Sequence, residues 1–324
     1  MKRTRAHQVS FIVALPIAIV ILTSLSPVLA IVTPSPDILD SIVAEAMEKP
    51  PPEPPFHLDV RYRRALVGSR RLDIYEPLGD AETPAPAIVV FHGGSWVRGD
   101  KVTVRIADRF LRRMREQGYF VIAVNYTTSA LRGLTGPVEN AKTALAWIVE
   151  QAGEYGYDPQ RIGLYGVSAG GHVALMAVST MPRIEFSFAF VECAPTDLVA
   201  MREGEAFESS SVFRMFRESR LRELSPIQHV GAHVPPVLIY HGTQDRIVHV
   251  NQSASYVAAV TTAGGDAELV LYPEGDHAFI NLPDETWFEQ ETQALEFFAR
   301  HFSGAGRGTT AVGLEPIPEL GAPR

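Results

Sequence analysis

The sequence carries a serine in a setting that favours nucleophilic catalysis. Ser168 lies in the glycine-rich stretch at residues 166–171, which follows a short apolar run and precedes a helical pattern. A serine at a tight turn from a strand into a helix is held in strained backbone angles, so the residues two before and two after it must be almost free of side chain. Gly166 and Gly170 occupy these two positions. We therefore predict a nucleophile elbow, in which the turn lifts the Ser168 hydroxyl above the edge of a sheet.

A second motif supplies groups that could stabilise negative charge on a substrate oxygen. The apolar run at residues 87–91 leads directly into His92, Gly93 and Gly94. Glycines after a strand allow backbone N–H groups to turn outward, and the helix after the elbow points its N-terminus at the same place. We expect the N–H groups of Gly94 and Ala169 to form an oxyanion hole, with Gly93 shaping the turn.

An acid and a histidine follow the serine in the order that a triad on such an elbow requires. Asp245 comes shortly after the apolar run at residues 235–240, and His277 comes after the run at residues 267–272. Asp197, after the strand that follows the elbow helix, is the alternative acid, although an aspartate there usually caps a turn or a helix. We assign Asp245 as the acid and His277 as the base.

Two apolar features could bound a substrate pocket. Trp96 stands beside the oxyanion glycines, where it either walls the pocket or packs under its loop. Residues 206–224 hold too many apolar side chains for a plain connection, and they predict either a small cap over the serine or a helix packed flat on the sheet. Walls of this kind favour acyl groups of roughly two to four carbons, because burying a methylene cannot offset a steric clash.

No metal site is expected from the sequence. His229 and His233 have the spacing of a zinc pair on a helix, but Gly231 and the prolines that follow prevent a continuous helix. The single cysteine, Cys193, excludes an internal disulfide and is expected to be a buried, inert thiol at the end of a strand. Asp276, beside the histidine, is expected to be a loop residue.

The alternation of apolar runs with helical patterns predicts an α/β fold with a mostly parallel central sheet and helices on both faces. The expected strands form a hairpin at residues 56–77 and then lie at residues 87–91, 119–125, 161–165, 185–192, 235–240 and 267–272. The expected helices lie at residues 102–117, 137–154, 170–180 and 250–262.

The 324 residues suffice for one catalytic domain, which we place at residues 56–302. Residues 1–30 have the basic start, apolar run and small residues of a signal peptide, and an uncleaved membrane anchor at residues 11–32 is the alternative. Residues 31–55 predict a short helix and a proline-rich linker, and residues 303–324 predict a disordered tail. The expected localisation is therefore periplasmic or extracellular, with membrane contact only if the first segment stays uncleaved.

Charge narrows the range of partners. The chain has 29 Lys and Arg against 37 Asp and Glu, for a net charge of -8 at neutral pH. An acidic chain without a long basic run does not favour a phosphate backbone, so no nucleic-acid partner is expected.

These motifs resemble those of the α/β-hydrolase-fold serine esterases. The chain is similar to acetyl-esterase, hormone-sensitive-lipase-like and bacterial feruloyl-esterase-like carboxylesterases over about residues 56 to 302. The matching blocks lie at residues 72–77, 92–96, 158–162, 166–171, 241–248 and 275–279. The resemblance implies that Ser168 is the nucleophile, His277 the base and Asp245 the residue that orients it. Ser95 and Val167 depart from the hormone-sensitive-lipase pattern, which has a third glycine and an acidic residue there.

The resulting expectation is an exported, cofactor-free serine hydrolase that cleaves small-molecule carboxylic esters through an acyl-enzyme. Three alternatives remain open at this point: an amide-cleaving relative such as an arylformamidase or a peptidase, a polysaccharide acetyl or feruloyl esterase, and a non-catalytic binding protein with this fold. Loss of the serine or the histidine is typical of the last class, and both are present. The sequence does not predict the oligomeric state.

Overall fold

The computed structural model describes residues 41, 44–50, 52–63, 70–128, 134–203, 213 and 216–304. The expected signal segment at residues 1–30, its anchor alternative at residues 11–32 and nearly all of the expected tail at residues 303–324 lie outside this part. Residues 44–48, within the segment expected to hold a short helix, are helical. Among the helices of the described residues, none has the length and apolar character needed to cross a membrane.

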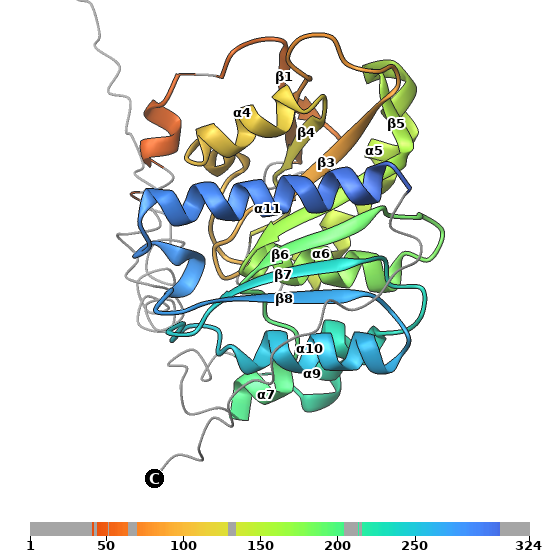
Figure 1. Ribbon diagram of the computed structural model, residues 1–324. Coiled ribbons are helices and arrows are strands. Elements are labelled where there is room, and N and C mark those ends of the chain that lie inside the picture. Colours follow the sequence, from red (N-terminus) through yellow and green to blue (C-terminus); the bar gives the residue numbers. More distant parts are fainter. Residues whose placement is uncertain are drawn as a thin grey trace, which may run out of the picture.

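A single sheet of eight strands forms the centre of the molecule (Figure 1). The strands lie side by side in the order β1-β2-β4-β3-β5-β6-β7-β8. The first two ladders, β1 with β2 and β2 with β4, are antiparallel, and all later ladders are parallel. The strand bounds are β1 Phe56–Arg61, β2 Arg71–Tyr75, β3 Ala85–Phe91, β4 Phe120–Val124, β5 Tyr157–Val167, β6 Phe188–Glu192, β7 Val237–Gly242 and β8 Ala267–Tyr272. The mostly parallel sheet that the sequence predicts is thus confirmed.

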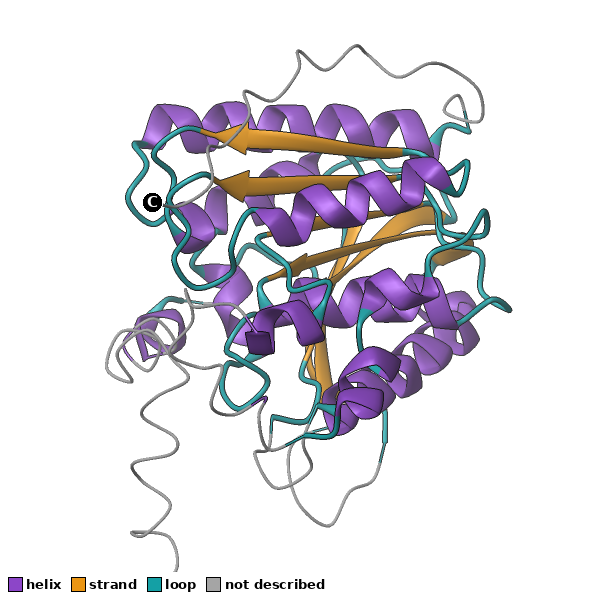
Figure 2. Ribbon diagram, turned by 90° about the horizontal axis from the view of Figure 1, so that it is seen from below, coloured by secondary structure: helices purple, strands orange, loops and turns teal. Residues whose placement is uncertain are grey.

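Helices cover both faces of this sheet, as Figure 2 shows from below. The helix bounds are η1 Lys101–Arg105, α4 Asp108–Glu116, α5 Thr135–Tyr155, α6 Ala169–Thr180, α7 Leu198–Glu203, α9 Glu218–Glu223, η3 Pro226–His229, α10 Asn251–Thr262, η4 His277–Phe279 and α11 Asp284–Phe302. Side chains of α4 and α11 share one hydrophobic cluster, whereas those of α5, α6 and α10 belong to the cluster on the other face.

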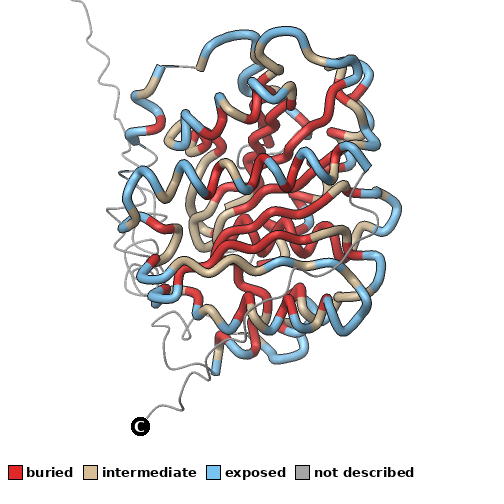
Figure 3. Tube along the Cα trace, viewed as in Figure 1, coloured by how far each residue is buried: buried red, intermediate tan, exposed pale blue. Residues whose placement is uncertain are grey.

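The inner strands β3, β4 and β6 are apolar apart from Glu192 and fully buried because both of their faces are covered. Along β3, Val89 and Phe91 belong to the cluster with α5 and α6, and Ile88 and Val90 belong to the cluster with α4 and α11. Successive side chains of a strand point to opposite faces, so a continuous apolar run is what a strand buried on both sides requires. The buried trace in Figure 3 accordingly follows the sheet. The carboxyl ends of the parallel strands form one edge, where the site described below is found.

Two helical regions differ from the sequence prediction. The single helix expected at residues 102–117 is divided into η1 and α4, because Asp100 caps the first turn by accepting from Val102 N at 3.0 Å and the backbone at Ala107 leaves the helical region. The sequence pattern predicts no helix after residue 279, whereas α11 begins at Asp284 and packs on one face of the sheet. Of the segment expected to form a cap, residues 206–224, positions 206–212, 214 and 215 lie outside the described residues.

Candidate active site

Ser168 occupies the turn between β5 and α6 and has a strained backbone. Its φ is 53° and its ψ is −119°, a conformation that few residues other than glycine adopt. The Ser168 N–H donates to the Glu192 carbonyl oxygen at 2.8 Å, and the Ser168 carbonyl accepts from His172 N at 3.0 Å. The turn is therefore held between the next strand of the sheet and the first turn of α6.

The flanking glycines are required by close contact. A Cβ atom at Gly166 would lie 2.4 Å from the carbonyl oxygen of Gly170, and one at Gly170 would lie 2.0 Å from the carbonyl oxygen of Phe91. Both distances are far shorter than any van der Waals contact, and the atoms involved are backbone atoms that cannot move aside. The elbow thus packs directly against the end of β3, which carries the oxyanion motif.

The side chains of Ser168, His277 and Asp245 form one hydrogen-bonded chain. The Ser168 Oγ lies 2.9 Å from His277 Nε2, and His277 Nδ1 lies 2.7 Å from Asp245 Oδ2. The carboxylate has no proton to give, so Nδ1 donates to it, and when the imidazole is neutral Nε2 accepts from the serine hydroxyl. Ser168, Asp245 and His277 come from the ends of three different strands, and the structure brings all three together.

Asp245 is fixed by several donors in a buried position. Its Oδ1 accepts from the backbone N–H groups of Ile247 and Val248, both at 2.8 Å, and its side chain is fully buried. Burial alone would raise the pKa of this carboxyl group, but hydrogen bonds from His241, His277 and the Val248 N–H outweigh burial and hold the pKa well below its usual value. Asp245 is therefore ionised at neutral pH.

The protonation of His277 is set by opposing influences. Burial lowers the pKa of its imidazole, whereas the hydrogen bond to the Asp245 carboxylate and the charge of that carboxylate raise it. The raising influences outweigh burial, so the pKa of His277 lies well above its usual value of about 6.5. Its side chain is 14% exposed, which leaves one part of the ring open towards solvent.

Gly93 and Gly94 lie beside the elbow on the loop that leaves β3. A Cβ at Gly93 would be 3.7 Å from Ser168 Cβ, so this glycine lies next to the nucleophilic side chain. Gly94 has a φ of 121°, and a Cβ there would be 2.4 Å from the Arg98 carbonyl oxygen. Gly94 therefore needs to be glycine because of its backbone conformation and this close contact, whereas a Cβ at Gly93 would meet only near-normal distances. Ala169 is the first residue of α6 and adjoins Ser168 from the other side.

His92 and Tyr126 brace the start of this loop. The Tyr126 hydroxyl donates to the His92 carbonyl oxygen at 2.6 Å, and the two rings stack with centroids 4.4 Å apart. His92 Nδ1 lies 2.7 Å from the Gly93 carbonyl oxygen, which has only acceptor capacity, so Nδ1 carries the proton. Burial lowers the pKa of His92, which favours this neutral form.

Trp96 packs beneath the loop. It is 5% exposed, its ring meets Phe213 edge-on, and its indole N–H donates to His172 Nδ1 at 3.1 Å. His172 Nε2 in turn lies 2.7 Å from the Leu224 carbonyl oxygen, and burial lowers the pKa of His172 to about 4. These contacts agree with the packing alternative for Trp96, and a role in bounding the acyl group stays a prediction.

The other residues considered from the sequence have local structural partners. Asp197 Oδ1 accepts from the N–H groups of Val199 and Ala200 and so caps the start of α7, which confirms the capping alternative. Asp276 pairs with Asn281 within its loop. Of Asp197, Asp276 and Asp245, the carboxylate that binds His277 is that of Asp245.

The two histidines with zinc-like spacing contact different carbonyl groups. His229 Nε2 lies 2.7 Å from the Glu223 oxygen, and His233 Nε2 lies 2.9 Å from the Ser179 oxygen. Each is thus used in bonding to the backbone, which gives no support to a metal pair.

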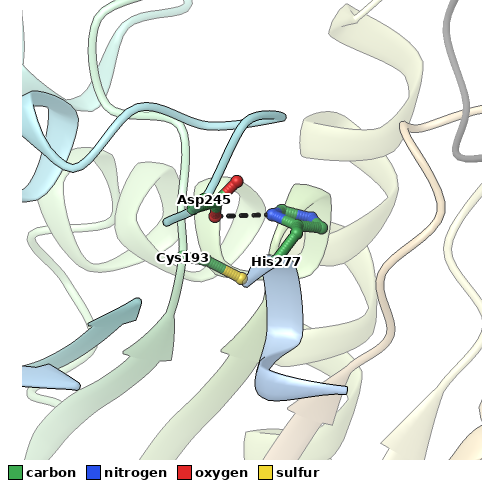
Figure 4. A group of neighbouring side chains, drawn as sticks. All are labelled: Cys193, Asp245 and His277. Carbon is green, nitrogen blue, oxygen red and sulfur yellow. Dashed lines mark hydrogen bonds and ion pairs between the residues drawn. The ribbon is translucent and has the colours of Figure 1, made fainter. Parts of the chain in front are cut away.

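Cys193 is a neighbour of the site that sequence reasoning missed. Its sulfur lies beside His277 and Asp245 (Figure 4), and one ligand atom from each of the three residues falls within 4.8 Å of the others. Within the described part of the chain, this is the group whose spacing could hold a metal ion, although the bond between His277 and Asp245 already uses two of the ligands. Burial raises the pKa of the thiol, so it stays protonated. The available signal was its position directly after β6, at the same sheet edge as Ser168.

The sequence matches one family model and is similar to several named esterases. A family model described as BD-FAE matches residues 72–260, which is more than half of the chain. Esterase LipC of Mycobacterium tuberculosis is 28% identical over 243 residues, covering 65% of this chain and 60% of that protein. The probable carboxylic ester hydrolase LipM of the same organism is 26% identical over 278 residues, covering 79% of this chain and 62% of its own length. The chain spans 52 to 62% of the first curated relatives that it matches.

A solved structure with the same fold extends this comparison. Thermogutta terrifontis esterase 2, with propionate bound, superposes with a TM-score of 0.61 at 25% identity and covers 78% of this chain and 94% of its own. The strand order, the two covered faces and the elbow described above are those of the α/β-hydrolase fold. Motifs, topology and family match agree, and the chain therefore belongs to the BD-FAE family.

Proposed function

We propose that the protein is a serine hydrolase of carboxylic esters that works through an acyl-enzyme. The observation that carries this proposal is the continuous hydrogen-bonded chain from Ser168 through His277 to Asp245, with distances of 2.9 and 2.7 Å. Two curated relatives have names that describe ester hydrolysis, and their similarity supports the same reaction class here.

In the first half of the reaction, Ser168 attacks the ester carbonyl while His277 Nε2 removes its proton. Asp245 holds the imidazole with its proton on Nδ1 and stabilises the positive charge that the ring gains. Because the carboxylate is ionised, it can do so without itself taking up a proton. The protonated His277 then gives its proton to the departing alcohol, which leaves the acyl group on Ser168.

The oxygen that becomes negative in this step needs donors beside the serine. The backbone N–H groups of Gly94 and Ala169 are our candidates, because Gly93, the residue before Gly94, lies next to Ser168 on one side and α6 begins at Ala169 on the other. The N-terminus of α6 adds a favourable dipole at the same position. In the second half of the reaction, His277 activates a water that releases the acid by the same route.

We propose short acyl groups as the substrates. The likeness to an esterase whose structure contains propionate supports an acyl group of this size. Trp96 and Phe213 are buried against each other at the oxyanion loop, and we propose that they bound the acyl group.

The proposal is tested by hydrolysis of a series of p-nitrophenyl esters from acetate to octanoate, with an acetylated sugar and an aryl amide measured in parallel. We expect the highest kcat/KM at roughly two to four carbons, since longer chains gain only about 0.8 kcal/mol per buried methylene. Ser168→Ala, a variant that should fold normally, serves as the control in every assay. A preference for acyl chains of octanoate length, or for the amide, would contradict the proposed substrate class.

A further inference from the structure

We infer that His241 is a positioning residue that fixes Asp245 for catalysis, an inference that rests on the proposed function. His241 is on β7, four residues before Asp245, and is completely buried. It does not touch Ser168 in any contact described above, so its action on the reaction would pass through the carboxylate.

The hydrogen bonds of His241 define its tautomer. Its Nε2 lies 2.7 Å from the Val248 carbonyl oxygen and 3.3 Å from Asp245 Oδ2. Both partners are acceptors without a proton, so Nε2 must carry the hydrogen. In the neutral ring Nδ1 is then an acceptor, and the Ser253 hydroxyl, 2.6 Å away, donates to it. Ser253 is itself fully buried on α10, so the ring is anchored at both nitrogens.

This geometry places His241 and His277 on the same carboxylate oxygen of Asp245. Asp245 Oδ2 faces His277 Nδ1 at 2.7 Å and His241 Nε2 at 3.3 Å. The other carboxylate oxygen, Oδ1, accepts from the N–H groups of Ile247 and Val248. The carbonyl oxygen that His241 binds belongs to Val248 in the same loop. One imidazole therefore contacts both the carboxylate and the loop that carries it, and it fixes the direction in which Oδ2 points.

The charges near this pair determine what the loss of His241 should do. The titratable groups around Asp245 are His241, His277 and Cys193, and the Cys193 thiol is neutral because burial raises its pKa. The N–H of His241 withdraws negative charge from Oδ2. Without that donor, more of the charge acts on His277, so the pH at which His277 loses its proton should move upward.

Two substitutions of His241 test whether the residue positions Asp245 or only fills space in the core. In His241→Gln the side-chain amide nitrogen can reach the position of Nε2 and still donate to Asp245 and Val248. In His241→Asn the amide reaches only the position of Nδ1, so the bond to Ser253 can form but the donor to Asp245 is lost. His233→Asn, at a histidine that bonds to the Ser179 carbonyl oxygen, is the matched control.

The experiment measures kcat, KM, the pH profile of kcat/KM and the melting temperature of all four proteins. We expect His241→Asn to lose about a hundredfold in kcat with KM within about threefold of wild type, whereas His241→Gln stays within about tenfold. The rise of kcat/KM on the acid side of the pH profile should move to higher pH in His241→Asn and in no other variant. Equal losses in the two variants with an unmoved limb would overturn the inference and leave His241 with a structural role only.

A parallel measurement distinguishes this failure from a failure of the proposed function. Labelling of Ser168 by a fluorophosphonate depends on the nucleophile and on His277. If wild type is labelled and Ser168→Ala is not, the proposed function holds, and the comparison of the His241 variants then tests the positioning role alone. Rapid labelling of His241→Asn at the wild-type rate would also contradict that role.

Discussion

The backbone N–H of Ser168 donates a 2.8 Å hydrogen bond to the carbonyl oxygen of Glu192. This bond continues the β5–β6 ladder, in which Val167 is paired with Glu192, by one step into the strained turn. The elbow is thereby fastened to the sheet at the residue that bears the nucleophile. The side chain of Glu192 is buried and accepts from the Tyr165 hydroxyl at 3.1 Å.

This burial leads to a prediction about stability. Burial, with a smaller contribution from Glu291, raises the pKa of Glu192 from 4.5 to about 7. In the unfolded chain the group ionises near its ordinary pKa, so folding becomes less favourable as pH rises from about 4.5 towards 7. Glu192→Gln removes this penalty and keeps the side-chain volume. We expect it to stabilise the protein by about 2 to 3 kcal/mol more at about pH 8 than at about pH 5.

Denaturant unfolding of wild type and Glu192→Gln at the two pH values checks this expectation. The measurement at acidic pH is the internal control, because the carboxyl group is mostly protonated in the folded protein there. A stability difference that does not change with pH would show that Glu192 is already ionised without penalty.

The pH dependence of hydrolysis follows from His277. The base must be neutral to accept the Ser168 proton, and its pKa lies well above the usual value. Activity should therefore rise with pH through a midpoint above about 6.5. The pH profile of kcat/KM for p-nitrophenyl acetate, corrected for uncatalysed hydrolysis, measures this midpoint. A profile that is flat from acid to neutral pH would argue against His277 as the base.

The identity of the acid can be tested by a matched pair of substitutions. Asp245→Asn should lower kcat by about 10³ to 10⁴, because an amide no longer fixes the proton on His277 Nδ1. Asp197→Asn should leave kcat within about threefold of wild type, since asparagine also caps helices well. The same assay on both purified variants decides between them, and a larger loss at Asp197 would move the acid to the earlier strand.

The residues of this chain were predictable to different degrees. Ser168, Asp245 and His277 each follow a recognisable apolar strand, and the edge of a parallel sheet brings such positions together. The glycines were predictable because the turn admits no other residue. The oxyanion loop follows the same logic, since it directly leaves β3 beside the elbow.

Contacts that depend on packing could not be predicted in this way. Cys193 and His241 lie at the same sheet edge as the triad residues, but nothing in their neighbouring sequence indicates which way their side chains point. The division of residues 102–117 depends on Asp100, which caps η1 and is itself held by the Asn125 amide at 2.7 Å. Such an interaction joins two distant segments and becomes visible only in the folded chain.

Trp96 joins the two sides of the proposed oxyanion hole. It lies on the loop after β3, whereas its partner His172 is in the first turn of α6. Trp96→Phe keeps the ring packing but leaves His172 Nδ1 without its donor in a buried site, which should cost about 1 to 3 kcal/mol. Trp147→Phe, at a half-buried position on α5, is the control. Thermal unfolding of both variants measures the difference, and equal stabilities would show that the bond contributes nothing.

The most direct test of the proposed function is to trap the nucleophile. Wild-type protein and Ser168→Ala are treated with a fluorophosphonate, digested and examined by peptide mass spectrometry, while ester hydrolysis is followed in parallel. We expect one adduct on the peptide that contains Ser168, complete loss of activity on labelling, and a loss of about a millionfold in kcat for Ser168→Ala with an unchanged fold. Hydrolysis near the wild-type rate in Ser168→Ala, or an adduct on another residue that abolishes activity, would contradict the proposed mechanism.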